Sequence, residues 1–423
     1  MLRTTFIRAN RDLVIERMKK RNLNATEMID NIIALDDKRK STQHELDESL
    51  AQSNRISKQI GQLFKQGKKE EANAAREGVG QLKEQIKGLE EALRNIQNDL
   101  KTALYEIPNV PHESVPKGST DEDNEVFKAW EKELPVLEKG AKPHWELAEK
   151  YDIIDMKLGT KITGAGFPLY KGKGAKLQRA LIAFFLDEAE ANGYLEIMPP
   201  LMVNEASATA TGQLPDKEGQ MYHAVADDLY LIPTAEVPIT NIYRDTIVKE
   251  SDFPIKLAGH TPCFRREAGS YGAHVRGLNR VHQFDKVEIV RIVHPDTSYN
   301  DLEEMLVHVE SLLTKLELPF RILRLCGGDL GFTSALTFDF EVYSAAQKRW
   351  LEVSSVSNFE TFQANRLKVR FKDGKKTRLA HTLNGSAMAL ARIVAALLEN
   401  NQTPEGIIIP EALRPYTRFD KIS

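Results

Sequence analysis

The sequence contains 423 residues, of which 41% are hydrophobic and 28% are charged, and its formal net charge is −3. This length and composition predict a globular, soluble chain of two or three domains. Because its charges nearly balance, the protein is not a polycation, and a nucleic-acid partner would need a local basic patch.

Three features bear on where the protein resides. No apolar run in the sequence is long enough to span a bilayer. Cys263 and Cys326 form no CxxC pair and no metal-ligand cluster, which indicates reduced thiols. The Arg-rich first residues resemble a transit peptide, but Asp12 and Glu16 interrupt that pattern. We therefore expect a cytoplasmic protein that has no membrane segment.

Residues 28–104 form the first distinct segment, with no proline and with Phe64 as its only aromatic residue. An apolar series at alternating steps of three and four consists of Val79, Leu82, Ile86, Leu89, Leu93, Ile96 and Leu100. An earlier, less regular series consists of Ile29, Ile32, Leu46, Leu50, Ile56, Ile60 and Leu63. The polar residues 66–78 separate these two coiled-coil seams. The pattern predicts an antiparallel helical hairpin whose helices of about 35 residues are roughly 50 Å long.

Two functions suit such a hairpin. The heptads alone are equally typical of a dimerisation coiled coil. The first helix, however, carries no acidic residue from position 55 to position 69, near the expected tip. The basic residues of this stretch are Arg55, Lys58, Lys65, Lys68 and Lys69. They could form a solvated face, but at the tip of a long arm they also suit a phosphate backbone.

The second part of the chain begins after a linker. Residues 105–125 contain three prolines and an acidic cluster, which predicts irregular structure. The strand candidates that follow are residues 229–232, 286–292, 338–343 and 350–355. Long irregular connections separate them, without regular alternation of strands and helices. This predicts an α+β fold with a mainly antiparallel sheet.

One predicted helix and one predicted strand lie just before these candidates. Apolar spacing over residues 176–192 predicts a helix that Gly193 closes. The next residues, 193–203, are rich in apolar side chains but contain Pro199 and Pro200. Because proline cannot donate to a sheet, we expect an edge or interface strand there.

Arginine, acidic, histidine and aromatic residues are most concentrated in the segment CFRREAGSYGAHVRGLNRVHQFDKVEIV at residues 263–290. Its glycines predict a loop between two strands. Its arginines suit phosphate, its phenylalanine suits base stacking, and a carboxylate of the segment suits a hydrogen-bond donor. A structural salt-bridge network explains the same residues equally well. Neither GxxxxGK[ST] nor GxGxxG after a strand is present, so neither common phosphate loop accounts for nucleotide binding.

This segment resembles motif 2 of the class II aminoacyl-tRNA synthetases, in the form found in seryl-tRNA synthetases. Three other segments resemble that family in the same order: LIPTAEVP at 231–238, LEVSSVSN at 351–358 and HTLNGSAMALAR at 381–392. GYLEIMPP at 193–200 resembles motif 1, the dimer element. The resemblance covers the whole chain, including the hairpin, and implies a class II catalytic domain.

The resemblance implies ATP-dependent activation of L-serine to seryl-adenylate and its transfer to tRNA(Ser), and also to tRNA(Sec). Arg265 is expected to hold the α-phosphate together with the serine carboxylate, and Arg392 the γ-phosphate. Glu352 and Ser355 are the expected ligands of Mg²⁺, which bridges the phosphates. The implied ATP-binding residues are Arg265, Arg266, Glu267, Val281, Phe284, Glu352, Val353, Ser354, Ser355 and Arg392.

The same resemblance implies a serine pocket. Its expected members are Thr234, Ala235, Glu236, Arg265, Glu288, Thr382, Asn384 and Ser386. Glu288 supplies a negative charge for the α-ammonium group, and the threonine and serine hydroxyls pair with the substrate hydroxyl. When alanine binds instead of serine, the buried groups that pair with the substrate hydroxyl lose their partner, so the pocket favours serine strongly.

The sequence departs from the family at a few positions. Ala273, His274, Val275 and Arg276 stand where the motif 2 loop commonly reads Arg-Asp-Thr-Arg, which affects contacts with ATP and the tRNA acceptor end. Asn365 stands where the family usually has an arginine. None of these departures removes a residue to which the resemblance gives a catalytic role.

The expected organisation is a tRNA-binding arm at 1–107, a linker at 108–135 and a class II catalytic domain at 136–423, assembled as a homodimer. Two alternatives remain. One is an inactive paralogue that only binds RNA or protein. The other is an amino acid:carrier protein ligase, whose relatives lack the long hairpin.

Overall fold

The computed structural model describes residues 1–216, 219–267 and 276–423. The chain packs into two units, one of residues 1–19 and 23–108 and one of residues 20–22 and 109–423. No helix in the described ranges is both long and apolar enough to cross a membrane. The two units are described separately.

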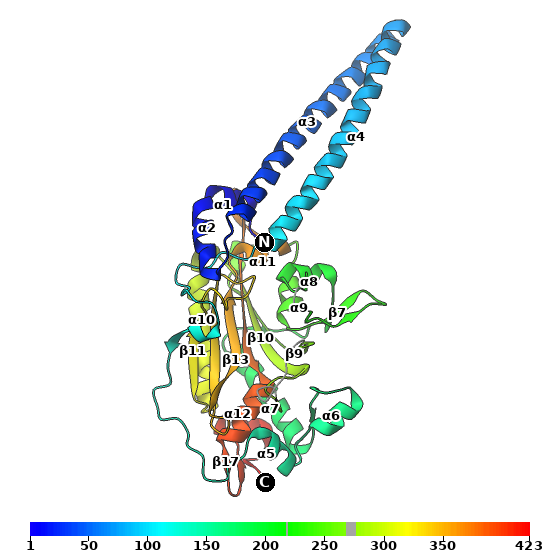
Figure 1. Cartoon of the computed structure of the whole chain (residues 1–423). Helices are drawn as coiled ribbons and strands as arrows, with labels where there is room; N and C mark the ends of the chain where they lie inside the picture. The colour runs from blue at the N-terminus through cyan, green and yellow to red at the C-terminus, as the bar shows by residue number, and fades with distance from the viewer. Residues whose placement is uncertain (217–218, 268–275) are drawn as a thin grey trace. The chain divides into compact units, whose positions relative to one another are not determined.

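The first unit is a helical hairpin, as predicted (Figure 1). Two short helices, α1 (Thr4–Ala9) and α2 (Arg11–Met18), precede the long helices α3 (Thr26–Lys65) and α4 (Lys69–Glu106). The long helices contain 40 and 38 residues, which corresponds to a length of about 60 Å. The buried seam residues are Ile29, Ile32, Leu46, Val79, Leu82, Leu93, Ile96 and Leu100.

The connection between the long helices is shorter than predicted. Residues 66–78 were expected to break the helices, but only residues 66–68 do so, and α4 begins at Lys69. Gly67 adopts a φ of +77° in this turn, a conformation that glycine tolerates best. The stretch after it lacks large apolar groups but is rich in alanine, the best helix former. Helix propensity therefore extends the helix through a segment where the heptad pattern is weak.

The irregular spacing of the first seam has a structural cause. Asp36 is buried between Ile32 and Leu46, where an apolar residue would continue the pattern. Its carboxylate forms ion pairs with Lys40 at 2.6 Å and with Arg39 at 2.9 Å. Since these pairs compensate the buried charge, the helix tolerates an acid in its seam.

The second unit is built on an eight-stranded sheet with the order β1-β11-β12-β13-β16-β10-β9-β4. In that order the strands are β1 (Glu125–Lys128), β11 (Phe320–Arg324), β12 (Leu336–Ser344), β13 (Arg349–Asn358), β16 (His381–Ala389), β10 (Gln283–Val293), β9 (Ile255–Phe264) and β4 (Leu195–Glu196). All neighbours pair antiparallel except β4 and β9. The fold is therefore α+β with a mainly antiparallel sheet, as predicted.

The longest helices that pack against this sheet are α7 (Gly172–Ala191), α10 (Ser298–Lys315) and α12 (Leu390–Asn400). Leu181, Phe185, Phe340 and Ile393 lie in the core between helices and sheet. The helix α7 begins at Gly172 rather than at Lys176, because Gly174 allows close packing. A Cβ atom on Gly174 would lie 2.3 Å from the carbonyl oxygen of Ile153.

Short elements complete the second unit. The helices are α5 (His144–Lys150), α6 (Met156–Ile162), α8 (Glu205–Thr211), α9 (Glu236–Asn241), α11 (Thr361–Leu367) and α13 (Arg414–Thr417). One small sheet pairs β5 (Met202–Asn204), β7 (Leu229–Leu231) and β6 (His223–Ala224). A second small sheet pairs β2 (Ile154–Asp155) with β3 (Leu169–Tyr170). A third contains β8 (Ile247–Val248), β14 (Arg370–Asp373) and β15 (Lys376–Leu379). A fourth contains β17 (Gln402–Thr403), β18 (Gly406–Ile408) and β19 (Lys421–Ile422).

Two segments differ from the predictions in detail. Part of the expected linker 108–135 is β1, which pairs with β11 at one edge of the large sheet. The single strand expected at 193–203 is two strands, because Pro199 and Pro200 separate β4 from β5. Only β4 belongs to the large sheet, at its other edge. The prediction of an edge strand there is confirmed for β4.

Candidate active site

A cavity of ≈ 470 Å³ opens in the second unit. The neighbouring strands β13, β16 and β10 line it, together with the start of α12 and the segments that precede α9 and β10. Side chains alternate between the two faces of a strand, so Phe284, Lys286 and Glu288 of β10 all reach the cavity. The sheet thus presents a row of polar and charged groups on one face.

The cavity brings together most of the residues that the sequence predicts for ATP and serine. Those that line it are Thr234, Glu236, Arg265, Glu267, Val281, Phe284, Glu288, Glu352, Val353, Ser354, Ser355, Asn384, Ser386 and Arg392. Ala235, Arg266 and Thr382 are not among its lining residues. Ala235 and Thr382 are fully buried beside it. The roles of all these residues remain predictions.

Three groups with affinity for nucleotides line the cavity. The Arg265 guanidinium lies 5.4 Å from the centre of the Phe284 ring, and its Nε donates to the Pro233 carbonyl oxygen at 3.3 Å. Arg392 donates from Nη1 to the Glu352 carbonyl oxygen at 2.7 Å. Its Nη1 also lies 3.5 Å from the Glu352 carboxylate. Two guanidinium groups and an aromatic ring suit a nucleotide triphosphate.

The end near β10 and α9 is a dense polar cluster. Thr234 Oγ1 donates to Glu288 at 3.1 Å and accepts from Lys286 Nζ at 2.9 Å. Lys286 and Glu288 also form an ion pair, and both side chains are buried. The cluster therefore holds a carboxylate and a hydroxyl in fixed positions, which suits a small polar substrate such as an amino acid.

Glu236 lies beside this cluster and is held by Gln363. Gln363 Nε2 donates to Glu236 Oε1 at 2.6 Å, and Gln363 Oε1 accepts from Thr382 Oγ1 at 2.9 Å. Burial, followed by the nearby charge of Glu288, raises the pKa of Glu236 to about 7. Thr382 therefore acts on the site through Gln363.

Sequence reasoning missed two residues of this cluster, Lys286 and Gln363. Lys286 stands two positions before Glu288, so strand periodicity places both on the same face and was sufficient to find it. Gln363 lies on α11 and reaches Glu236 only through the tertiary fold. No local signal in the sequence identifies it.

The predicted ligands of a divalent metal ion, Glu352 and Ser355, lie on β13. Asp339 lies directly opposite Ser355 on β12, and among the described residues its buried Oδ1 finds no hydrogen-bond partner. Burial and the nearby Glu352 carboxylate raise the pKa of Asp339 well above its usual value. Oxygen donors of this kind suit a hard cation. Within residues 1–216, 219–267 and 276–423, no three acidic, imidazole or thiol groups gather in a metal-binding arrangement, so phosphate oxygens would supply further ligands.

The predicted tRNA-binding residues lie on the helical hairpin. Arg55, Lys58 and Lys65 are on α3, Lys68 is in the turn, and Lys69 begins α4. All five side chains are exposed. The altered loop residues Ala273, His274 and Val275 lie outside the described residues. Arg276 is described, and its guanidinium lies 4.9 Å from the centre of a Trp145 ring.

Comparisons with known proteins identify the family. Residues 1–111 match the model of the seryl-tRNA synthetase N-terminal domain, and residues 221–401 match that of the tRNA synthetase class II core domain (G, H, P, S and T). A serine–tRNA ligase of Salinibacter ruber is 50% identical over 425 residues, which cover 100% of this chain and 99% of that protein. The chain belongs to the seryl-tRNA synthetase family. The serine–tRNA ligase of Geobacter sulfurreducens is 43% identical over 98% of both chains.

Solved structures of the seryl-tRNA synthetase family share this fold over the full chain. The Pyrococcus horikoshii seryl-tRNA synthetase complexed with ATP has a TM-score of 0.92 at 32% identity, and the match covers 100% of this chain and 99% of that one. The cytoplasmic serine–tRNA ligase of Naegleria fowleri in complex with AMP has a TM-score of 0.88 at 25% identity, with the same coverage. Nothing in these comparisons favours an inactive paralogue or a carrier protein ligase over a seryl-tRNA synthetase.

Proposed function

We propose that this protein activates L-serine with ATP and then transfers the serine to tRNA(Ser). The observation that carries the proposal is a single cavity in which Arg265, Phe284 and Arg392 lie beside the Thr234, Lys286 and Glu288 cluster. Sites for a nucleotide and for a small polar amino acid therefore adjoin one another. Membership of the seryl-tRNA synthetase family supports the same activity.

The first step joins serine to the nucleotide. A carboxylate oxygen of serine attacks the α-phosphorus of ATP, the bond to the bridging oxygen breaks, and pyrophosphate leaves. This step needs no general base, because the attacking carboxylate is already ionised. Arg265 aligns the two reactants and neutralises the charge that builds on the α-phosphate, while Arg392 holds the γ-phosphate.

The second step transfers serine to the tRNA. A hydroxyl group of the terminal adenosine attacks the carbonyl carbon of seryl-adenylate, and AMP leaves. The exposed basic side chains near the end of the hairpin contact the tRNA backbone. tRNA(Sec) is a second substrate in this proposal.

Mg²⁺ accompanies ATP. Glu352 and Ser355 would hold it, and the buried Oδ1 of Asp339, which finds no partner among the described residues, supports an ion in this place. When bound, the ion would neutralise phosphate charge.

The protein acts as a cytoplasmic homodimer in this proposal. The segment that contains Pro199 and Pro200 follows the edge strand β4 and exposes large apolar side chains. Met198 is 90% exposed and Leu195 is 63% exposed. A second copy of the chain that covers this edge removes both from water.

The decisive experiment is serine-dependent exchange of pyrophosphate into ATP, repeated with threonine, alanine and cysteine. We expect strong exchange with serine and little with the other three. The charging of tRNA(Ser) transcripts then tests the second step. Absence of exchange with serine would overturn the proposal, and exchange without tRNA charging would favour the carrier protein alternative.

A further inference from the structure

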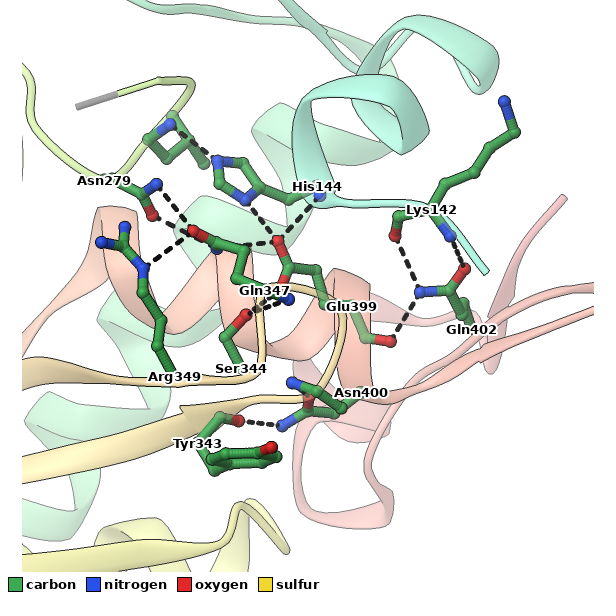
Figure 2. A network of polar contacts seen from close by, with 12 residues as sticks. Lys142, His144, Asn279, Tyr343, Ser344, Gln347, Arg349, Glu399, Asn400 and Gln402 are labelled. Carbon is green, nitrogen blue, oxygen red and sulfur yellow. Dashed lines mark hydrogen bonds and ion pairs between the residues drawn. The ribbon is translucent and has the colours of Figure 1, made fainter. Parts of the chain in front are cut away.

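A buried polar network, drawn in Figure 2, contacts Leu278 and Asn279, which line the cavity. His144, the first residue of α5, is 1% exposed, and Glu399, near the end of α12, is 0% exposed. The ring Nδ1 of His144 lies 2.6 Å from Glu399 Oε1, and the backbone N–H of His144 donates to the same oxygen at 2.9 Å. No part of this network was predicted as functional from the sequence.

The other ring nitrogen of His144 contacts the chain that lines the cavity. Its Nε2 accepts a hydrogen bond of 2.8 Å from the backbone N–H of Leu278. Since a backbone N–H can only donate, Nε2 carries no proton, and Nδ1 is the atom that donates to Glu399. His144 therefore links a buried carboxylate to one backbone amide.

The approach of His144 to this segment is close. Gly277 has a φ of +69°, and a Cβ atom there would lie 2.3 Å from His144 Nε2. The neighbouring Trp145 ring lies against the Arg276 guanidinium, at 4.9 Å. The start of α5 thus holds three consecutive residues, 276–278, where the chain returns to β10.

Glu399 also fixes the next residue, Asn279. Gln347 Nε2 donates to Glu399 Oε1 at 3.0 Å, and Asn279 Nδ2 donates to Gln347 Oε1 at 2.9 Å. Ser344 Oγ donates to Glu399 Oε2, so both carboxylate oxygens are satisfied. These bonds offset the cost of burying the charge. One carboxylate therefore anchors Leu278 through His144 and Asn279 through Gln347.

The anchored segment reaches Arg392. Leu278 and Asn279 both line the cavity, and the Asn279 carbonyl oxygen accepts from Arg392 Nε at 3.0 Å. Arg392 and Glu399 are seven residues apart on α12, about two helical turns. Hydrogen bonds therefore connect the Glu399 carboxylate to the Arg392 guanidinium through residues 278–279, and α12 carries both side chains.

We propose that His144 and Glu399 are positioning residues for ATP. They hold the carbonyl oxygen of Asn279, which fixes Arg392 Nε, so that the guanidinium presents its Nη2 group to the phosphates while Nη1 stays bonded to Glu352. They transfer no proton and touch no substrate. This inference rests on the proposed function of Arg392 and adds the residues that orient it.

Two substitutions separate this role from simple stabilisation. In His144→Gln, the side-chain amide reaches the place of Nε2 and can accept from Leu278. In His144→Asn, the shorter amide reaches only the place of Nδ1, so it pairs with Glu399 and leaves Leu278 without a partner. We expect His144→Asn to raise the Kd of Mg-ATP, measured by calorimetry, and the KM for ATP in exchange by about tenfold or more. His144→Gln should recover most of this loss, and the KM for serine should change little in either variant.

Asn400→Ala is the matched control, because the hydrogen bonds that it removes, to the backbone of Tyr343 and Ala345, involve neither His144 nor Gln347. It should lower the Tm and leave the Kd of Mg-ATP near that of the wild type. The inference is overturned if His144→Asn binds ATP as well as His144→Gln does. It is also overturned if ATP affinity follows the Tm across all three variants. Failure of the proposed function is a separate result, namely wild-type protein that binds ATP but shows no serine-dependent exchange.

Discussion

Gln363 Nε2 donates a hydrogen bond of 2.6 Å to Glu236 Oε1, and both side chains are buried at the edge of the cavity. Burial and the charge of Glu288 raise the pKa of Glu236 to about 7 despite this bond. The carboxylate of Glu236 is therefore charged above about pH 7 and neutral below it. A group predicted to bind serine thus changes its charge close to neutral pH.

We predict that serine binding weakens as the pH falls. Protonation of Glu236 removes a negative charge that, together with that of Glu288, attracts the ammonium group of serine, so the KM for serine should rise by up to about tenfold for each unit below the pKa of Glu236. Exchange kinetics between about pH 8 and pH 6 measure this. The KM for ATP should stay flat. In Glu236→Gln the pH dependence should vanish, and its persistence there would assign the effect to another group.

Lys286 gives a second prediction, about stability. Lys286→Met leaves the buried Glu288 carboxylate without its ion-pair partner, which should lower the free energy of unfolding by about 3–5 kcal/mol. Urea denaturation measures the loss. The double variant Lys286→Met/Glu288→Gln has no unpaired charge and should regain much of the stability. Equal stability of the single and double variants would show that the unpaired Glu288 carboxylate is not the cause of the loss.

Local sequence patterns predicted the helices and strands well, because the periodicity of helices and strands depends on residues that are near one another in the sequence. The seam residues such as Leu93 and Ile96 are buried, and β10, β12 and β13 contain the predicted strands. The extent of α4 was missed because alanine propensity outweighs a weak heptad pattern. Asp36 in the seam was missed because the seam was read from its apolar residues alone, although Arg39 and Lys40 stand three and four positions later, where a helix brings them beside it. Its further partner Arg8 comes from α1, which no local pattern indicates.

The candidate site likewise contains residues that local sequence patterns predict and residues that they do not. Residues within motifs, such as Arg265, Glu288 and Arg392, line one cavity as the motifs suggest. Supporting contacts come from distant segments: Gln363 of α11 donates to Glu236, and His144 of α5 accepts from Leu278. Their contacts span more than a hundred positions in the sequence, so no spacing rule connects them.

The basic residues of the hairpin lead to a third prediction. Replacing Lys65, Lys68 and Lys69 with alanine should raise the KM for tRNA(Ser), because fewer phosphate contacts form and fewer counterions are released on binding. The slope of log affinity against log salt should become shallower by roughly 0.7–0.9 per contact. Filter binding at several salt concentrations measures this slope. Alanine at the exposed Lys132, Lys139 and Lys375 of the second unit is the control, and the same loss there would indicate a general charge effect.

Deletion of residues 26–103, with a short linker in their place, separates the two steps of the reaction. The second unit has its own hydrophobic core, which runs from Val115 to Ile422, and α3 and α4 bury their seams against one another. Serine-dependent pyrophosphate exchange should therefore remain largely intact. Charging of tRNA(Ser) should fall roughly a hundredfold or more, because the phosphate contacts of the arm are lost. Both activities are measured on one preparation, with the Tm as a check on folding. Equal loss of exchange and charging in a folded deletion variant would contradict a tRNA-holding arm and indicate that the hairpin supports the catalytic site itself.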